Sequence, residues 1–173
     1  MILKEDEITR YAEEYTRKLP DLLVGVAHIT NCQGAMNSGV AKSIRDRWPE
    51  TFTVYSIDCL GRNPKELLGK QTSVEVMSHK EGGSLEVYNM NCQLNYGYDG
   101  GQYLNYDALI ENLKVLAKTD RQVIIFPYLM GCGRAGGDFD KVVSLVRKYL
   151  VEKIVIWVKY KGKDIMGGKQ WNK

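Results

Sequence analysis

Short apolar runs alternate with amphipathic segments along most of this chain. The runs are rich in Val, Ile, Leu and aromatic residues, which is typical of strands in a buried sheet. Strands are predicted at residues 1–3, 22–27, 73–77, 85–92, 122–127 and 154–158. The first would be a very short edge strand, and the others would build a largely buried sheet.

Between these runs, apolar residues recur at spacings of three and four, which predicts helices with one buried face. Helices are expected over residues 7–18, 38–48, 106–116 and 139–150. Residues 51–57 fit either a strand or a helical turn, because they are rich in β-branched and aromatic side chains. The alternation of strands and helices predicts the α/β class, with a mixed sheet and helices on both faces.

Composition adds little to the predicted fold class. A chain of 173 residues suits one domain, and 44% hydrophobic with 26% charged residues is typical of globular proteins. The net charge of +3 is not gathered into one strong block, so nucleic acid is not expected as a partner. We expect a single monomeric domain over residues 1–160 and a polar tail over residues 161–173.

Four cysteines, Cys32, Cys59, Cys92 and Cys132, lie far apart and form no C-x-x-C pair. With only two histidines in the chain, this pattern predicts no metal site, and no motif calls for a cofactor. No base stands beside Cys32 or Cys132 in the sequence, so a cysteine nucleophile is not expected. The chain begins without a signal-peptide pattern and has no run long enough to span a membrane. We therefore expect a cytoplasmic protein with free thiols and no membrane partner.

Two glycine-rich loops each lie between a predicted strand and a predicted helix. The first follows His28 and contains Gly34 and Gly39, and the second runs from Gly131 to Asp138. Neither matches the P-loop or the dinucleotide fingerprint. Backbone N–H groups and a helix N-terminus attract phosphate and sugar oxygens, so the loops could hold two ends of one extended ligand. The alternative is that the glycines only form turns.

Three polar side chains in these regions are candidates for chemistry. Asn31 could hold a sugar hydroxyl or could stabilise its own loop. His28 could transfer a proton near neutral pH or could be a core histidine with a satisfied ring. Asp138 could orient a water molecule or could cap the helix that follows it.

Other loop side chains also have two interpretations. Arg134 suits a phosphate charge but could equally face solvent. Tyr96, Tyr98 and Tyr103 could line a nucleobase or ribose, although loop aromatics often serve only packing.

Several ordered motifs resemble those of one family. They are Asn-Cys-Gln-Gly (31–34) with Ser-Gly-Val-Ala (38–41) and Arg-Trp-Pro (47–49), Leu-Leu-Gly-Lys (67–70), Asn-Cys-Gln (91–93) with Tyr-Asp-Ala-Leu (106–109), and the stretch from 127 to 139. Together they cover about residues 22–158 and resemble the macro domain, most closely the branch of ADP-ribose-1''-phosphate phosphatases and their phage-type relatives. The resemblance implies a three-layer α/β/α domain that holds ADP-ribose in a surface cleft.

The resemblance also implies roles for single residues. Asn31 would contact the distal ribose, and Asp6, near the first strand, would accept the adenine amino group. The two loops would hold the rest of the ligand through backbone N–H groups. The residues implied in this binding are Gly34, Ser38, Gly39, Val40 and Ala41 in the first loop, and Gly131, Cys132, Gly133, Arg134, Ala135, Gly136 and Gly137 in the second.

The leading functional hypothesis is an enzyme that hydrolyses ADP-ribose-1''-phosphate to ADP-ribose and phosphate. In this hypothesis His28 is the general acid or base, Asn31 holds the ribose and Asp138 orients water. The family's glycohydrolase branch places a catalytic lysine before the Tyr-x-x-Leu helix, and residues 97–105 contain none. Removal of ADP-ribose from a modified macromolecule remains an alternative, as does a module that only binds ADP-ribose or a related nucleotide.

Overall fold

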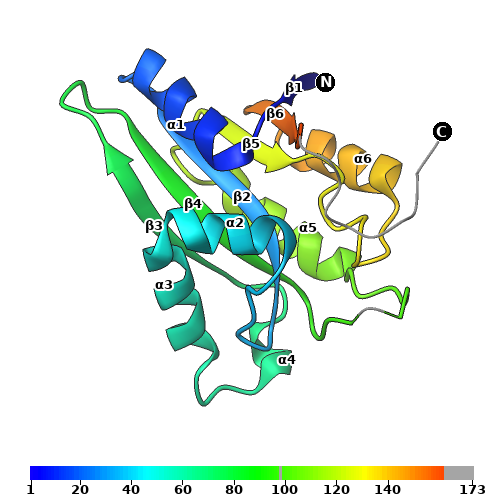
Figure 1. Ribbon diagram of the computed structural model, residues 1–173. Helices are drawn as coiled ribbons and strands as arrows, with labels where there is room; N and C mark the ends of the chain where they lie inside the picture. Colours follow the sequence, from blue (N-terminus) through cyan, green and yellow to red (C-terminus); the bar gives the residue numbers. More distant parts are fainter. Residues whose placement is uncertain (98, 162–173) are drawn as a thin grey trace.

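The computed structural model describes residues 1–97 and 99–161 and shows one six-stranded sheet between helices (Figure 1). The strands are β1 (Ile2–Glu5), β2 (Leu23–Asn31), β3 (Gln71–Ser78), β4 (Ser84–Gln93), β5 (Val123–Pro127) and β6 (Ile154–Lys159). The described helices are α1 (Ile8–Lys18), α2 (Gly39–Arg47), α3 (Pro49–Cys59), α4 (Pro64–Leu67), α5 (Tyr106–Ala117) and α6 (Phe139–Tyr149). The α/β class is confirmed.

The strand order is β1-β6-β5-β2-β4-β3, and β3 alone runs antiparallel to its neighbour. The sheet is therefore mixed, as predicted. Because β2, β4 and β5 are parallel, their carboxyl ends lie at the same edge of the sheet. Ligands of such sheets bind at this edge.

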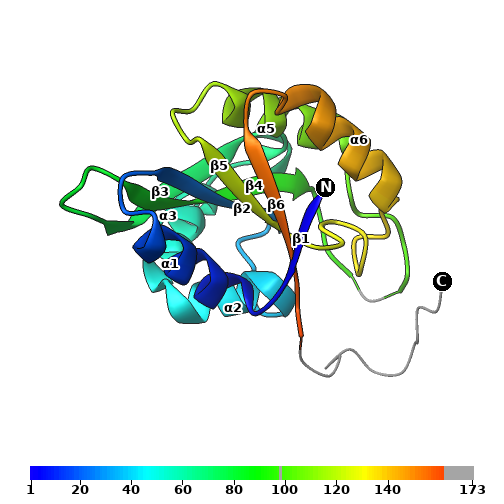
Figure 2. The ribbon, with the colours of Figure 1, turned by 90° about the horizontal axis from the view of Figure 1, so that it is seen from above.

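Two hydrophobic cores cover the two faces of the sheet, and Figure 2 shows α5 and α6 on one side with α1, α2 and α3 on the other. Apolar side chains of alternating position on each strand fill these cores, as strand geometry requires. The α5/α6 core includes Leu109, Leu113, Phe126, Val146 and Trp157, and the α1/α2/α3 core includes Ala12, Val26, Ile44, Tyr55 and Ile125. The predicted three-layer α/β/α arrangement is thus confirmed.

A buried carboxylate ties α1 to the end of α2. Glu13 is 5% exposed and accepts hydrogen bonds from Arg47 Nε at 2.6 Å and Nη2 at 2.7 Å. Trp48 Nε1 and Arg17 Nη2 complete its shell at 3.1 and 3.0 Å. Paired in this way, the buried charge fixes the helix that follows the first loop.

The structure decides one segment that the sequence left open, and two others differ from the prediction. Residues 51–57 belong to helix α3, because Pro49 is well suited to a first helical turn and Thr51 and Tyr55 bury one helical face. Strand β2 continues to Asn31, so His28 lies inside the strand. A short helix, α4, begins at Pro64, outside every predicted helix, and its first turn is capped by Asn63.

Two sequence predictions fall partly outside the described residues. These are the role of Tyr98 and the polar tail, of which only Lys161 is described. The boundary between domain and tail therefore stays a prediction. Within residues 1–97 and 99–161, no helix combines the length and the apolar content that crossing a membrane requires.

Candidate functional site

Two glycine-bearing loops leave the carboxyl edge of the sheet, and both contact the segment 94–105, of which the structure describes residues 94–97 and 99–105. The first loop, residues 32–38, follows β2, and the second loop, residues 128–138, follows β5. Cys32 N–H donates to Gln93 O at 2.8 Å, and the Gln33 amide donates to Leu94 O at 2.8 Å. From the other side, two N–H groups of the same segment, those of residues 103 and 104, donate to Ala135 O. This segment therefore holds both loops.

Asn31 uses its whole side chain to shape the first loop. Its Oδ1 accepts from Gln33 N–H at 2.9 Å and Ala35 N–H at 3.3 Å, and its Nδ2 donates to Ala35 O at 2.8 Å. Asn31 is only 7% exposed. This geometry supports the interpretation of Asn31 as a loop-stabilising asparagine.

Tyr55 is a support of the first loop that the sequence did not reveal. Its hydroxyl is fully buried and lies 2.7 Å from Asn31 O and 2.9 Å from Asn31 Oδ1. Burial raises the pKa of Tyr55 far above its usual value, so the hydroxyl keeps its proton. The sequence did not predict this contact, because residues 51–57 could not be assigned to a helix. Only a helix brings Tyr55 to this position.

The amino end of α2 is left open in front of the first loop. Ser38 has an extended backbone, and its side chain makes no capping hydrogen bond. Gly39 has a φ of +58°, and a Cβ there would meet no atom within 4 Å. The first N–H groups of α2, at Gly39, Val40 and Ala41, are thus available to an oxygen-rich ligand.

The second loop is shaped by close packing of glycines. A Cβ on Gly137 would lie 2.5 Å from Leu104 Cδ2 and 2.6 Å from Gly131 O. Gly131 and Gly136 have φ values of +72° and +67°, which favour glycine. Gly133 is different, since a Cβ there would meet nothing within 4 Å. The loop is therefore packed against segment 94–105 on one side and open at Gly133.

The second loop also carries backbone strain at a residue other than glycine. Leu129 has a φ of +59° and is the one such residue with a positive φ among those described. Its strain is tolerated because two turn hydrogen bonds fix the chain there, Met130 N–H to Pro127 O and Cys132 N–H to Leu129 O. Strained backbone of this kind is often found in ligand loops.

Asp138 ends the second loop and caps α6. Its Oδ1 accepts from Lys141 N–H at 3.1 Å, and its own N–H donates to the Tyr106 hydroxyl at 2.8 Å. The capping interpretation of Asp138 is thus observed, while its exposed carboxylate remains accessible to water.

His28 is a core residue in this structure. It is 1% exposed, and its Nε2 lies 2.7 Å from Asn89 Oδ1, so Nε2 carries the proton. Asn89 in turn donates to Thr51 O at 3.0 Å. Burial lowers the pKa of His28 to about 4, despite the opposing hydrogen bond with Asn89. A buried, neutral ring beneath α3 supports the core interpretation rather than proton transfer at neutral pH, but only Nε2 of the ring is satisfied, because Nδ1 has no hydrogen-bond partner among the described residues.

Asp6 lies directly after β1 at the same edge of the sheet. Its Oδ1 accepts from Arg10 Nε at 2.8 Å and from Glu7 N–H at 2.7 Å. Partial burial would raise the pKa of Asp6, but the hydrogen bonds from Arg10 and Glu7 lower it below its usual value. The carboxylate predicted to meet adenine is ionised and already paired.

The remaining predicted side chains have more ordinary surroundings. Arg134 is exposed in the second loop, and Tyr103 donates its hydroxyl to Asp99 Oδ1 at 2.8 Å. Burial raises the pKa of both Cys32 and Cys132 to about 11, so each thiol stays protonated at neutral pH. Within the described part of the chain, no three His, Cys, Asp or Glu side chains gather to hold a metal ion.

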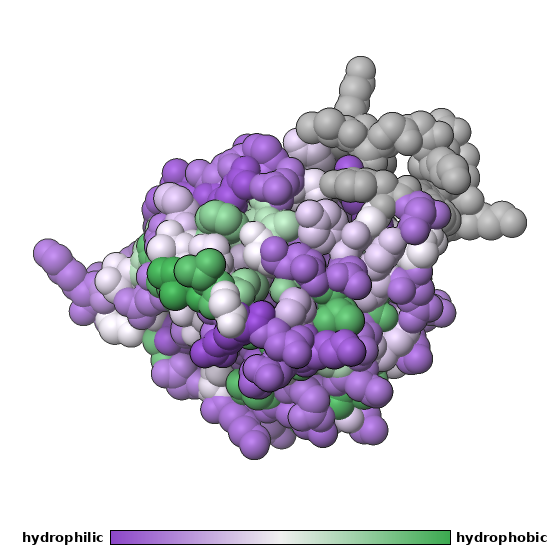
Figure 3. Space-filling view, turned by 90° about the horizontal axis from the view of Figure 1, so that it is seen from below, coloured by the Kyte–Doolittle hydropathy of each residue, from purple (hydrophilic) through white to green (hydrophobic). Residues whose placement is uncertain are grey.

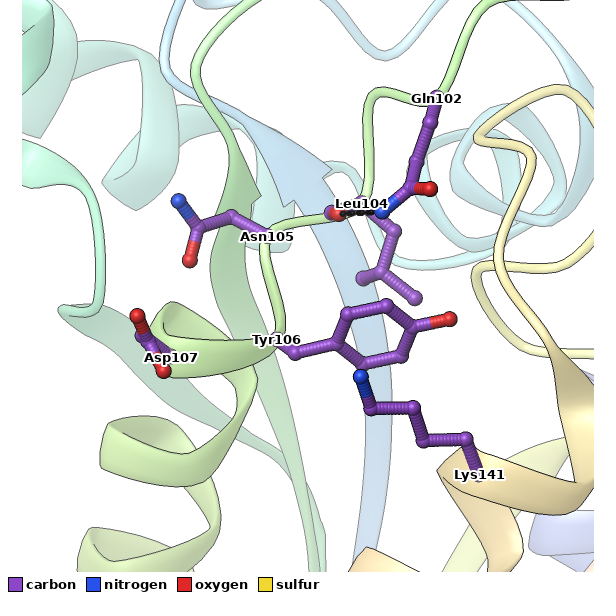
Figure 4. A pocket seen from close by; sticks show the side chains of 6 residues that line it. All are labelled: Gln102, Leu104, Asn105, Tyr106, Asp107 and Lys141. Atoms are coloured by element: carbon purple, nitrogen blue, oxygen red, sulfur yellow. Dashed lines mark hydrogen bonds between the residues drawn. The ribbon is translucent and has the colours of Figure 1, made fainter.

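A cavity of about 360 Å³ lies beside the second loop, between the first turns of α5 and α6 (Figure 4). Its lining residues are Gln102, Leu104, Asn105, Tyr106, Asp107 and Lys141. Sequence reasoning missed this feature, because its lining joins the end of segment 94–105 and the start of α5 to α6, which is distant in the chain.

The underside of the molecule, where α3 and α4 lie in Figure 1, is largely hydrophilic (Figure 3). Its apolar surface is divided into small separate areas. The large exposed apolar side chains at the end of α3 are Ile57 and Leu60.

Comparison with known proteins agrees with this architecture. No model of a known protein family matches the chain. An ADP-ribose 1''-phosphate phosphatase from Scheffersomyces stipitis is 28% identical over 146 residues, which cover 73% of this chain and 83% of the relative.

Solved structures resemble the fold over most of the chain. A protein from Bacteroides thetaiotaomicron is 21% identical with a TM-score of 0.68, covering 92% of this chain and 99% of its own. The macrodomain of Thermus aquaticus DarG is 17% identical with a TM-score of 0.62, covering 93% and 99%. Thermosipho africanus DarTG, solved in complex with ADP-ribose, is 15% identical with a TM-score of 0.60, covering 79% and 37%. This chain therefore has the same fold as the solved DarG macrodomain.

Proposed function

We propose that this chain binds ADP-ribose at the carboxyl edge of the sheet and hydrolyses ADP-ribose-1''-phosphate to ADP-ribose and phosphate. The observation that carries the proposal is the pair of loops held together by segment 94–105, with open N–H groups at Gly39 and open space at Gly133. Such a pair suits a ligand with a central diphosphate and two sugars. The phosphatase from Scheffersomyces stipitis and the ADP-ribose complex of DarTG support the same ligand class.

Each loop is proposed to bind its own part of the ligand. The first loop and the start of α2, from Gly34 through Ser38 to Ala41, bind the distal ribose. The second loop, residues 131–137, binds the diphosphate and the terminal group through backbone N–H groups and Arg134. Asp6 accepts the adenine amino group, and its ionised state suits this role.

The proposed chemistry rests on Asp138 and on the loop N–H groups. Asp138 is exposed at the end of the second loop, where its carboxylate can orient a water molecule against the terminal phosphate. Fixed N–H donors stabilise the charge that develops on the phosphate oxygens. Asn31 contributes by shaping the first loop, and His28 contributes by filling the core, because its buried neutral ring offers no route for a proton.

A second candidate is a module that binds ADP-ribose without turnover. The observation in its favour is that the candidate acid and base His28 is buried and neutral, while the thiols of both loops are protonated. The two candidates share one site and differ only in chemistry at Asp138.

Phosphate release from ADP-ribose-1''-phosphate separates the two candidates, with ADP-ribose affinity measured in parallel. The Asp138→Asn variant should lower kcat at least about 100-fold, as expected for the loss of acid–base catalysis. Asparagine caps helices as well as aspartate does, so the fold and ADP-ribose binding should be retained. Asp140→Asn, in the same helical turn, is the matched control and should leave kcat unchanged.

Three other results have distinct meanings. Tight ADP-ribose binding without phosphate release would support the binding module. Consumption only of an ADP-ribosylated macromolecule would assign the same site to de-ADP-ribosylation. Failure to bind ADP-ribose would contradict both candidates.

A further inference from the structure

Tyr106 contacts the end of the second loop, although the proposed function gives it no role. It is the first residue of α5, and its hydroxyl accepts the N–H of Asp138 at 2.8 Å. Asp138 is the residue proposed to orient water, so this hydrogen bond holds the main chain from which that carboxylate projects. What the hydroxyl can do for Asp138 depends on how firmly Tyr106 itself is held.

The main chain at Tyr106 is fixed by the end of β4 and by a helix cap. Asn105 N–H donates to Cys92 O at 2.8 Å, and Asn105 Oδ1 accepts from Ala108 N–H at 2.9 Å, which caps α5. Just after this first turn, Leu109 is fully buried in the α5/α6 core. Tyr106 therefore projects from the anchored start of a helix.

Tyr106 and Asp138 are also joined through Lys141, in the first turn of α6. Asp138 Oδ1 accepts from Lys141 N–H at 3.1 Å, and Lys141 Nζ lies 3.8 Å from the centre of the Tyr106 ring. Figure 4 shows the Lys141 side chain extending from α6 to this ring. A cation over an aromatic face is attracted to it, so this contact holds the ring against α6. Three contacts thus link the three residues to one another.

These contacts leave part of the Asp138 carboxylate unused. Its Oδ1 caps α6, and its Oδ2 accepts no hydrogen bond from the described residues. Burial raises the pKa of the Cys132 thiol to about 11, and the charge of Asp138 adds to this effect, so the carboxylate lies near the second loop. One oxygen therefore fixes the helix, while the other can bind a water molecule beside the loop.

We propose that Tyr106 is a positioning residue for the reaction, because its hydroxyl holds the Asp138 main chain and so sets the direction of the carboxylate that orients water. This inference rests on the proposed function and leaves its binding roles unchanged. Tyr106 acts through Asp138 and needs no contact with the ligand. Loss of its hydroxyl would leave the Asp138 N–H without this partner and let the start of α6 shift, which would misplace the carboxylate.

The test removes this hydroxyl alone and together with the Asp138 carboxylate. For Tyr106→Phe, Asp138→Asn and the double variant, we would measure kcat and KM for ADP-ribose-1''-phosphate and the dissociation constant of ADP-ribose. Loss of one hydrogen bond predicts that Tyr106→Phe lowers kcat about tenfold and changes KM and the dissociation constant less than about twofold. In the Asp138→Asn background the same change should alter kcat less than about twofold, because the carboxylate that Tyr106 positions is already missing.

The matched control is Tyr149→Phe. Tyr149 lies at the other end of α6 and also has a lysine over its ring, Lys148 at 5.3 Å, but its hydroxyl makes no hydrogen bond within the described part of the chain. Its removal should leave kcat within about twofold of the wild type. Circular dichroism should show that Tyr106→Phe stays folded, because the ring is retained.

Each other result contradicts the inference in its own way. An unchanged kcat in Tyr106→Phe would show that the hydroxyl does not position Asp138, and the proposed function would stand. An equal fall in kcat with and without the Asp138 carboxylate would mean that Tyr106 acts independently of Asp138. A loss of ADP-ribose affinity that matches the loss of kcat would make Tyr106 only a support of the loop. If the unaltered protein releases no phosphate, the proposed function fails first, and this inference fails with it.

Discussion

The two loops at the carboxyl edge are held in place by different means. The first loop is fixed by buried side chains, chiefly Asn31 and the hydroxyl of Tyr55. The second loop is fixed by glycines that allow close backbone packing, such as Gly137 against Leu104. In the proposed function, both arrangements hold the N–H groups in place before the ligand binds, so less ordering entropy would be lost on binding.

This difference predicts opposite sensitivities to mutation. Removing a polar atom should damage the first loop, because buried partners would be left without hydrogen bonds. Adding a single methyl group should damage the second loop, because the packing leaves no space for it.

The largest expected effect is a loss of stability at low pH. It arises from His28 in β2, the strand that carries the first loop. His28 has a folded-state pKa of about 4, below the value of 6.5 for an unfolded chain. The stabilisation of the folded state by the neutral His28 ring is complete above pH 6.5. It is lost as the pH falls toward 4, because the unfolded chain binds the proton more readily than the folded chain does. The loss is about 3 kcal/mol in the free energy of unfolding.

Urea unfolding of the wild type and His28→Gln across this pH range measures the effect. The stability difference between the two proteins should change by about 3 kcal/mol from pH 6.5 to pH 4, because only the wild type carries the buried ring. Strand β5, which carries the second loop, has no titratable residue and should add nothing. Parallel pH profiles for the two proteins would contradict the burial of His28.

The second effect tests glycine packing in the second loop. Gly137→Ala places a methyl group 2.6 Å from Gly131 O and should cost about 2 kcal/mol in unfolding free energy, together with most ADP-ribose affinity. Gly133→Ala is the matched control for stability, because the same methyl group would meet open space there. Equal stability of the two variants would show that close packing does not hold this loop.

The third effect tests the side-chain support of the first loop. Asn31→Ala removes an acceptor for the N–H groups of Gln33 and Ala35 and should cost about 2 kcal/mol in unfolding free energy. Asn95→Ala, at the exposed partner of the Gln33 side chain, should cost less than about 0.5 kcal/mol. Similar denaturation midpoints for both variants would mean that Asn31 does not organise the loop.

The smallest effect isolates one hydroxyl group. Tyr55→Phe keeps the buried ring and should cost about 1 kcal/mol in unfolding free energy, with a matching loss of ADP-ribose affinity. Tyr88→Phe serves as the comparison, because Tyr88 is also buried and bonds through its hydroxyl to Glu86, away from both loops. It should lose stability without losing affinity. A Tyr55→Phe variant that binds ADP-ribose normally would remove Tyr55 from the account.

Much of the fold could be predicted from the sequence, because the spacing of apolar residues indicates most of the strands and helices. Strands such as β5 and helices such as α5 were found within a residue or two. Segment 51–57 could not be decided, because its helical character depends on packing of Thr51 and Tyr55 beneath the first loop. Local composition carries no information about that contact.

The candidate site was predictable only in outline. Glycine spacing identified both loops, since turns and open helix ends leave a local signal. The surroundings of His28 could not be predicted, because its depth depends on Asn89, which is distant in sequence and adjacent in the sheet. The same holds for the cavity around Tyr106 and Lys141, whose lining comes from segments far apart in the chain.

The central claim is that both loops bind one ligand. Amide hydrogen exchange with and without ADP-ribose tests it most directly, because the proposed contacts are backbone N–H groups. The account predicts slower exchange at residues 39–41 and at residues 133–135 in the same titration, with one shared dissociation constant. Protection of only one loop, or of neither, would contradict it.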